Sequence, residues 1–79
     1  MQKIEEIFGQ VVRRRREKKG LSQEDFADIA SIHRTYVSSI ELGKVQISIA
    51  IAEKLANALE TPLSQMFKDV ERQRAKASE

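Results

Sequence analysis

The feature that most constrains the fold of this chain is a very short gap between two helical stretches near its middle. One helix is predicted to begin at Gln23 and the next to run from Arg34 to Leu42, with about three residues around Ser31 and Ile32 between them. Two helices joined so closely cannot fold back antiparallel, so they must cross at a large angle.

Local signals at the start of the first of these helices agree with one another. Ser22 is a favourable N-cap residue, and Asp25 stands at the position of a capping-box acid. Leu21 and Phe26 are spaced as a hydrophobic staple. The residues expected to face inward are Phe26, Ala27, Ile29 and Ala30.

In the following helix Val37 and Ile40 form an apolar pair, and Gly43 closes the helix.

Three further helices are predicted on either side of this pair. The first carries an amphipathic stripe of helical period, and Gly20 can supply the left-handed residue after its end. Its stripe consists of Ile4, Ile7, Phe8, Val11 and Val12. Thr61 and Pro62 are predicted as the N-cap and first residue of the last helix. The polar residues 71–79 are expected to fray.

The segment before the last helix is ambiguous. Apolar residues alternate with polar or small ones over residues 45–51, which taken alone indicates a strand. Against this, Ser48 can cap a helix in which apolar residues recur at helical spacing. These residues are Ile51, Leu55, Ala58 and Leu59. We therefore predict a helix over Ile49–Leu59.

Length and composition favour one small globular domain over residues 1–79. The chain has 79 residues, of which 41% are hydrophobic and 33% charged, and it has no cysteine. The lack of cysteine excludes disulfides and thiolate zinc sites. No apolar run approaches the roughly 18–20 residues that span a bilayer, and the N-terminus does not resemble a signal peptide. We therefore expect a soluble intracellular protein with no membrane partner.

The residues give little support to catalysis. His33 is the single histidine, so neither a hydrolase triad nor a histidine metal pair can be assembled. The three glycines are isolated, which argues against a phosphate-binding loop. The acids Glu24, Asp25 and Asp28 are better explained as complements of a helix dipole than as a metal cluster. We expect no enzyme activity, no cofactor and no metal.

Charge is distributed unevenly along the chain. The formal net charge is only +2, but residues 13–19 (RRRREKK) hold six basic residues and one acid. Such a run is a footprint for a polyanion or simply the solvated end of a helix, and this feature alone does not separate the two.

The segment QEDFADIASIHRTYVSSIEL, residues 23–42, resembles the helix-turn-helix of the phage-repressor-like, or Xre-type, DNA-binding proteins. The motif's apolar and small positions are filled by Phe26, Ala27, Ala30, Ile32, Val37 and Ile40. The flanking GLSQ and IELGK are also similar to that family. The resemblance implies an all-α protein, a compact five-helix bundle of the lambda-repressor-like type with a central helix-turn-helix.

Within that family, HRTYVSSIELGK (residues 33–44) resembles the small controller proteins of restriction–modification systems. This implies a homodimeric transcriptional regulator that binds near-palindromic duplex DNA, autoregulates and contacts RNA polymerase in the bacterial cytoplasm, associated with the nucleoid when DNA-bound. The alternatives are a phage-type or stand-alone repressor, or an antitoxin-like protein-interaction module.

The resemblance also implies roles for individual residues. The base-reading candidates on the recognition helix are Arg34, Thr35, Ser38 and Ser39. The backbone-contact candidates are Gln23, Tyr36, Lys44 and Gln46. Arg16 and Glu41 are expected to form a structural ion pair. Surplus apolar residues give a candidate dimer surface, although about half of them could simply fill the core. They are Val45, Ile47, Ile49, Leu63, Met66 and Phe67.

Three positions depart from the family pattern. Ser31 stands where a glycine is usual in the turn, and a left-handed conformation there would cost about 1 kcal/mol more than for glycine. Ile47 replaces a frequent proline before the fourth helix. Arg15 replaces a leucine on the apolar side of the first helix, where its stem can pack while the guanidinium reaches solvent.

Overall fold

The computed structural model describes residues 2–77, and within that range the chain forms five α-helices and no strand. They are α1 (Ile4–Lys18), α2 (Gln23–Ala30), α3 (Arg34–Glu41), α4 (Ile49–Ala58) and α5 (Leu63–Ala77). The predicted all-α five-helix fold is confirmed.

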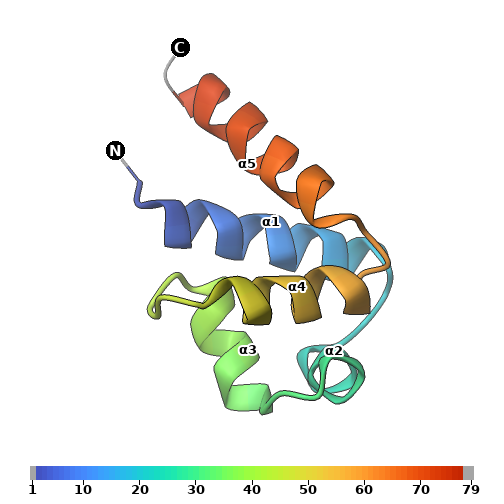
Figure 1. Ribbon diagram of the computed structural model, residues 1–79. Coiled ribbons are helices and arrows are strands. Elements are labelled where there is room, and N and C mark those ends of the chain that lie inside the picture. Colours follow the sequence, from blue (N-terminus) through green and yellow to red (C-terminus); the bar gives the residue numbers. More distant parts are fainter. Residues whose placement is uncertain (1, 78–79) are drawn as a thin grey trace.

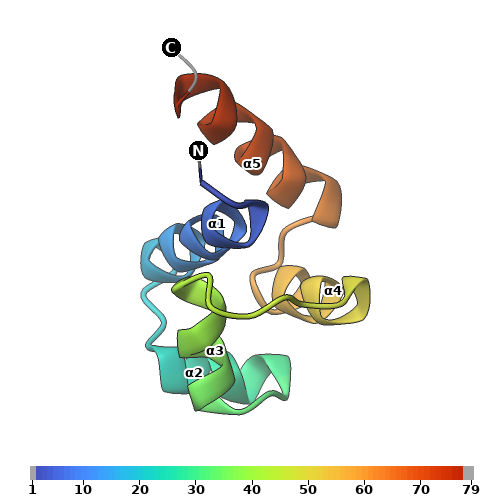
Figure 2. The same cartoon turned by 90° about the vertical axis from the view of Figure 1, so that its left-hand side faces the viewer.

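The helices are arranged around α1. It lies between α5 on one side and the crossed pair α2 and α3 on the other, and both views show this order (Figures 1 and 2). The helix α4 packs against both α2 and α5 and closes the bundle (Figure 1). As a result α2 and α3 form one end of the molecule.

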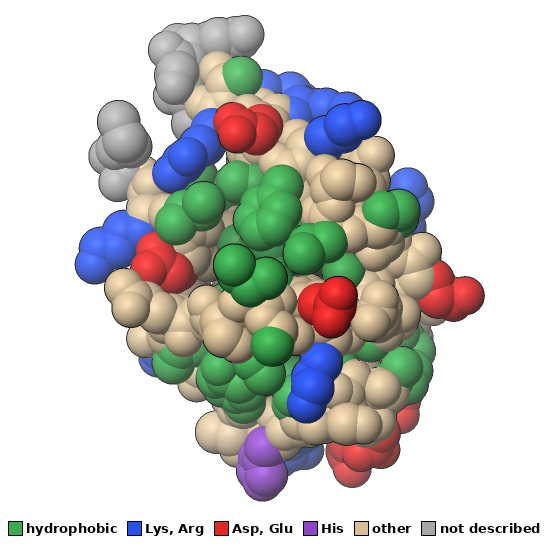
Figure 3. Space-filling model, in the orientation of Figure 1, with side chains coloured by type: hydrophobic (Ala, Val, Ile, Leu, Met, Phe, Trp, Pro, Cys, Tyr) green, Lys and Arg blue, Asp and Glu red, His purple; other side chains and the backbone are tan. Residues whose placement is uncertain are grey.

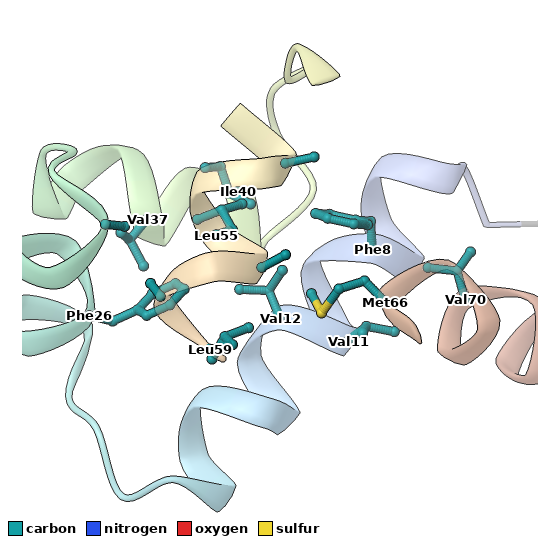
Figure 4. Packing of buried hydrophobic residues seen from close by; sticks show 14 of the residues in the cluster. Phe8, Val11, Val12, Phe26, Val37, Ile40, Leu55, Leu59, Met66 and Val70 are labelled. Carbon is teal, nitrogen blue, oxygen red and sulfur yellow. The ribbon is translucent and has the colours of Figure 1, made fainter. Parts of the chain in front are cut away.

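The core lies where the helices meet. The apolar stripe of α1 is buried as predicted, apart from Ile4 at its exposed start. Phe26, Leu55 and Val12 are among the fully buried side chains, which come together from α2, α4 and α1 (Figure 4). Burying a side chain of the Phe or Leu type stabilises a fold by about 1.5–3 kcal/mol. These contacts therefore fix the angle at which α2 and α3 leave α1.

The turn between α2 and α3 contains three residues. Ser31 adopts the left-handed conformation with φ 58°, as its position in the turn predicted. The amide of Ile32 then donates to the carbonyl of Ala27 at 3.0 Å, which gives this carbonyl in the last turn of α2 a hydrogen-bond partner. A second left-handed residue, Glu60 with φ 52°, ends α4 and was not anticipated.

The ambiguous segment is a loop followed by a helix. The hydroxyl of Ser48 accepts a hydrogen bond from the amide of Ile51 at 3.1 Å, so α4 begins at Ile49 as predicted. Val45 and Ile47 lie in the loop and are half-buried. The alternation over this segment therefore does not reflect a strand.

The helices α3 and α4 end one residue before the expected Leu42 and Leu59. Three further sequence-based expectations about the elements differ from the structure. Ile29 is 55% exposed, because Phe26, Ala27 and Ala30 already cover the buried face of the short α2. The last helix begins at Leu63, one residue later than expected, and Pro62 contributes its carbonyl to the amide of Met66.

The third difference concerns the C-terminal segment, where residues 71–77, which were expected to fray, continue the helix α5. Polar contacts with α1 hold it. Arg14 donates to Gln73, and Gln73 donates to Gln10. Residues 78 and 79 of the expected tail lie outside the described part.

Candidate nucleic-acid interface

Side-chain caps set the N-terminal ends of α2 and α3. The hydroxyl of Ser22 accepts a hydrogen bond from the amide of Asp25 at 3.0 Å. The Nδ1 atom of His33 accepts one from the amide of Thr35 at 3.1 Å, so His33 is the N-cap of α3. These caps begin both helices at defined residues and leave their first turns at the surface.

A hollow of about 480 Å³ lies between these two helix starts. It is lined by Ser22, Gln23, Glu24, Arg34, Thr35 and Ser38. Four of the candidate DNA-contacting residues therefore come together here, from two helices. They offer a guanidinium, an amide and two hydroxyls, which are the groups that hydrogen-bond base edges and phosphates.

Arg34 has an acidic neighbour in this hollow. Its Nη1 atom lies 3.6 Å from Oε2 of Glu24, with the two side chains 66% and 70% exposed. So exposed a pair contributes little to stability, and the guanidinium is accessible from solvent. The sequence did not reveal this pairing, because it arises only from the crossing of α2 and α3.

The other predicted contact residues lie outside the hollow. Tyr36 and Ser39 are half-buried, and Tyr36 packs against the core. Lys44 and Gln46 are exposed on the loop between α3 and α4. The amide of Lys44 donates to the carbonyl of Ser39 at 3.0 Å, which closes the end of α3. Their contacts with nucleic acid remain predictions.

The expected ion pair of Arg16 and Glu41 is present. Nε of Arg16 lies 2.7 Å from Oε2 of Glu41, and Nη2 lies 3.1 Å from Oε1, so the pair is bidentate. A third guanidinium nitrogen donates to the carbonyl of Leu21 at 2.7 Å. Hydrogen bonding to Glu41 raises the pKa of Arg16, although burial opposes it.

One link of this pair to the interface was not anticipated from the sequence. Nε2 of Gln23 donates to Oε1 of Glu41 at 3.1 Å. The candidate phosphate ligand at the start of α2 is therefore oriented by a buried carboxylate of α3. That carboxylate accepts hydrogen bonds from both Arg16 and Gln23, and its side chain is only 3% exposed.

An apolar area lies on another face of the molecule (Figure 3). Four candidate dimer residues line a hollow of about 290 Å³ there, namely Val45, Ile47, Ile49 and Phe67. Ile49 is 81% exposed, and the ring of Phe67 lies 5.7 Å from that of Phe8.

The prediction for Met66 is wrong, because its side chain is fully buried in the core near Phe8 and Val11 (Figure 4). It faces inward, whereas Phe67 beside it reaches the surface. Leu63 is half-buried and packs against the core.

Among residues 2–77, no three His, Asp or Glu side chains are grouped so that they could hold a metal ion. None of the helices in this range is sufficiently long and apolar to cross a membrane.

The chain matches known proteins over most of its length. A helix-turn-helix family model matches residues 12–66. The control protein C.MunI from Mycoplasma sp is 42% identical over 74 residues, which cover 92% of this chain and 100% of that protein.

Solved structures agree with this match. The restriction-modification controller protein C.AhdI from Aeromonas hydrophila is 37% identical, with a TM-score of 0.76 over 78% of this chain and 94% of that one. The controller C.Esp1396I, bound to a 25 base pair operator site, is 25% identical, with a TM-score of 0.86 over 95% of this chain and 99% of that one. The chain therefore belongs to the Xre-like helix-turn-helix family of DNA-binding proteins, in the branch that contains the control proteins of restriction–modification systems.

Proposed function

We propose that this protein is a transcriptional regulator of a restriction–modification system, which binds a near-palindromic operator as a homodimer and controls its own transcription. The observation that carries the proposal is the hollow between the starts of α2 and α3, where Arg34 and Thr35 stand beside Gln23. The similarity of the whole chain to the operator-bound C.Esp1396I supports the proposal that this fold binds an operator.

In this proposal α3 enters the major groove with its N-terminal end nearest the bases. Arg34 donates two hydrogen bonds to O6 and N7 of a guanine, a contact worth about 1–3 kcal/mol of discrimination. Thr35 contacts a thymine methyl group, and Ser38 and Ser39 reach bases one turn further along the helix.

Phosphate contacts fix the position of α3 in the groove. Gln23 binds a phosphate at the start of α2, and its hydrogen bond to Glu41 holds the amide in place before DNA arrives. Lys44 and Gln46 bind the backbone from the loop after α3, and Tyr36 adds a further contact. Of these four groups only Lys44 is a cation, and its phosphate contact supplies affinity that falls with rising salt.

Dimerisation through the apolar surface would place two copies of α3 about 34 Å apart, on the two half-sites of a palindrome. The surface consists of Val45, Ile47, Ile49 and Phe67. Leu63 contributes at its margin. The bound dimer represses by covering the promoter and activates by contacting RNA polymerase, and this activity belongs in the bacterial cytoplasm.

The test is a titration of the protein on DNA from upstream of its own gene, repeated across salt concentrations. We expect nanomolar binding that requires the palindrome and weakens steeply with salt. Arg34→Ala should weaken binding by about 5- to 150-fold at each half-site, because the homodimer loses one bidentate guanine contact from each of its two recognition helices. The control Lys54→Ala removes an equal charge from the exposed side of α4.

The two variants separate base reading from general electrostatics. If Arg34→Ala prefers the operator over a random duplex as strongly as Lys54→Ala and the wild type do, Arg34 does not read a base. If the wild type does not distinguish the upstream DNA from random duplex, the proposed regulatory function is wrong.

A further inference from the structure

A basic groove, distinct from the α2 and α3 interface, lies between α1 and α5. It is a hollow of about 470 Å³. Its five cations are Arg14, Arg15, Lys18, Arg72 and Lys76. Asp69 is its one carboxylate, and Gln73 its one neutral side chain. The groove therefore has a formal charge of +4 at neutral pH, whereas the whole chain has only +2.

Contacts within the groove neutralise little of this charge. Arg15 pairs with Asp69, with Nε 2.5 Å from Oδ2. Arg14 donates to the neutral amide oxygen of Gln73 at 2.9 Å and keeps its full charge. Arg14, Lys18 and the two α5 cations are exposed. A surplus of four cations remains at the surface.

The groove faces a different part of space from the recognition helix. Both views place α1 between α5 and the pair α2 and α3 (Figures 1 and 2). A duplex held by α3 therefore lies on the other side of α1. The segment of residues 23–41 carries four acids and one arginine, so the positive charge of the molecule is concentrated away from the proposed operator side.

The chemistry of the lining indicates the kind of partner. No aliphatic or aromatic residue lines the groove, whereas the buried centre of a protein–protein interface is apolar and depleted of lysine. Contacts with a phosphate backbone require only cations and hydrogen-bond donors. The phosphate backbone of a nucleic acid therefore fits this lining better than the surface of a protein does.

The cations form two rows. Arg14 and Lys18 are four residues apart on α1, as are Arg72 and Lys76 on α5, so the two members of each row lie about 6 Å apart along the helix axis. Each DNA strand carries one phosphate per roughly 3.4 Å of duplex axis, so each row can serve successive or alternate phosphates.

We propose that the groove between α1 and α5 is a second, sequence-independent binding site for the backbone of duplex DNA. It holds a DNA segment other than the one that α3 reads, so that an operator-bound protein can join two stretches of DNA. Its role as a second site rests on the proposed operator binding by α3, but the groove's affinity for phosphates does not.

The experiment is a two-duplex capture assay. A short operator duplex is immobilised and saturated with protein, and a labelled random duplex is then added. The test variant is Lys18→Gln/Arg72→Gln, which removes one exposed cation from each wall. The matched control is Lys54→Gln/Lys68→Gln, which removes two exposed cations from α4 and α5 outside the groove lining.

We expect the wild type and the control to retain the second duplex equally. The groove variant should bind the operator within about twofold of the wild type but retain about tenfold less of the second duplex. Its salt dependence for the random duplex should be shallower, with a slope reduced by about 2, because two phosphate contacts are lost.

Other outcomes overturn the proposal. They are a saturated wild type that retains no second duplex, a groove variant that retains as much as the wild type, and capture of a polyglutamate peptide in place of DNA. The last would assign the groove to an acidic protein.

Binding of the random duplex alone is also measured for Arg34→Ala, with and without the two groove substitutions. If the operator proposal fails, the groove substitutions should still weaken this binding, so failure of one proposal does not hide the result of the other.

Discussion

At the residue scale, the buried pair of Arg16 and Glu41 connects three helices. Arg16 belongs to α1 and Glu41 to α3, while Gln23 of α2 donates to the same carboxylate. A buried ion pair contributes little net stability compared with apolar residues, but removal of one partner leaves an uncompensated charge. The pair therefore makes the position of the recognition helix sensitive to either side chain.

We predict that Arg16→Met lowers the free energy of unfolding by about 3–5 kcal/mol, because Glu41 is left buried without its cation. The measurement is urea unfolding, with Arg13→Met as a control. Arg13 forms an exposed pair with Glu17 on the same helix, so its loss should cost less than about 1 kcal/mol. The double variant Arg16→Met/Glu41→Leu should recover much of the loss. Equal destabilisation by Arg16→Met and the control Arg13→Met would contradict this role.

A second residue-scale prediction concerns Glu24, whose carboxylate lies 3.6 Å from Arg34. Glu24→Gln should raise affinity about two- to fivefold at each half-site, because Arg34 then reaches DNA without breaking an exposed ion pair worth up to about 1 kcal/mol. The control Asp28→Asn removes an equal charge from the exposed side of α2. Equal gains in titrations of the two variants at one salt concentration would show that only the net charge matters.

At the scale of the elements, local chemistry predicted the helices and tertiary contacts decided what it missed. The caps at Ser22 and Ser48 act within a few residues, so the starts of α2 and α4 could be predicted from the sequence. The persistence of α5 could not, because it depends on Gln73 meeting residues of α1 that are about 60 positions away. The same holds for Met66, whose burial depends on how α5 lies against α1.

The candidate site divides in the same way. The family pattern placed Arg34 and Thr35 at the exposed start of α3, and the structure brings them into one hollow with Gln23. The contacts of Glu24 with Arg34 and of Gln23 with Glu41 were missed. Each joins two helices, and neither spacing along one helix nor composition carries that information.

The close approach of α1 to the end of α3 gives the third prediction. A Cβ atom at Gly9 would lie 2.2 Å from the carbonyl oxygen of Ile40 and 2.8 Å from that of Glu41. Gly9→Ala should therefore lower the stability by about 1–3 kcal/mol, despite the higher helix propensity of alanine. Thermal unfolding measures the loss. In Gly20→Ala the new Cβ meets no atom within 4 Å, and only its φ of +75° imposes a cost, of about 1 kcal/mol. An unchanged melting temperature for Gly9→Ala would contradict the close packing.

The junction of α1 and α5 gives a pH-dependent prediction. Burial raises the pKa of Asp69, but hydrogen bonds from Arg15 and Gln65 outweigh it, so the pKa lies below the ordinary value of 3.8. The ionised form is therefore favoured in the folded state, and its contribution is present above that value and lost as pH falls through the lowered pKa. Urea titrations should show Asp69→Asn less stable than the wild type at neutral pH, with a difference that shrinks in acid. A difference that stays constant down to about pH 2 would contradict this.

At the scale of the whole molecule, three surfaces of different chemistry share one small domain. The polar hollow at α2 and α3, the apolar area around Ile49 and Phe67, and the basic groove of α1 and α5 use different helix faces. A single copy offers only one short recognition helix, which limits the number of bases it can read. Operator specificity in this proposal therefore depends on the apolar surface as much as on α3.

This dependence gives the last prediction. Ile49→Glu places a charge at the most exposed apolar position of that surface without disturbing the core, so the fold should persist while the homodimer dissociates. Leu42→Glu is the matched control, because Leu42 is an exposed aliphatic side chain of the same size as Ile49 but does not line the apolar hollow. In sedimentation at micromolar concentration, the wild type and Leu42→Glu should be dimers and Ile49→Glu a monomer of unchanged helix content. On DNA, Ile49→Glu should bind a full palindrome no better than a single half-site, since the two recognition helices are no longer joined. A monomeric wild type, or a dimeric Ile49→Glu protein, would place the dimer contact elsewhere and leave the apolar area without this role.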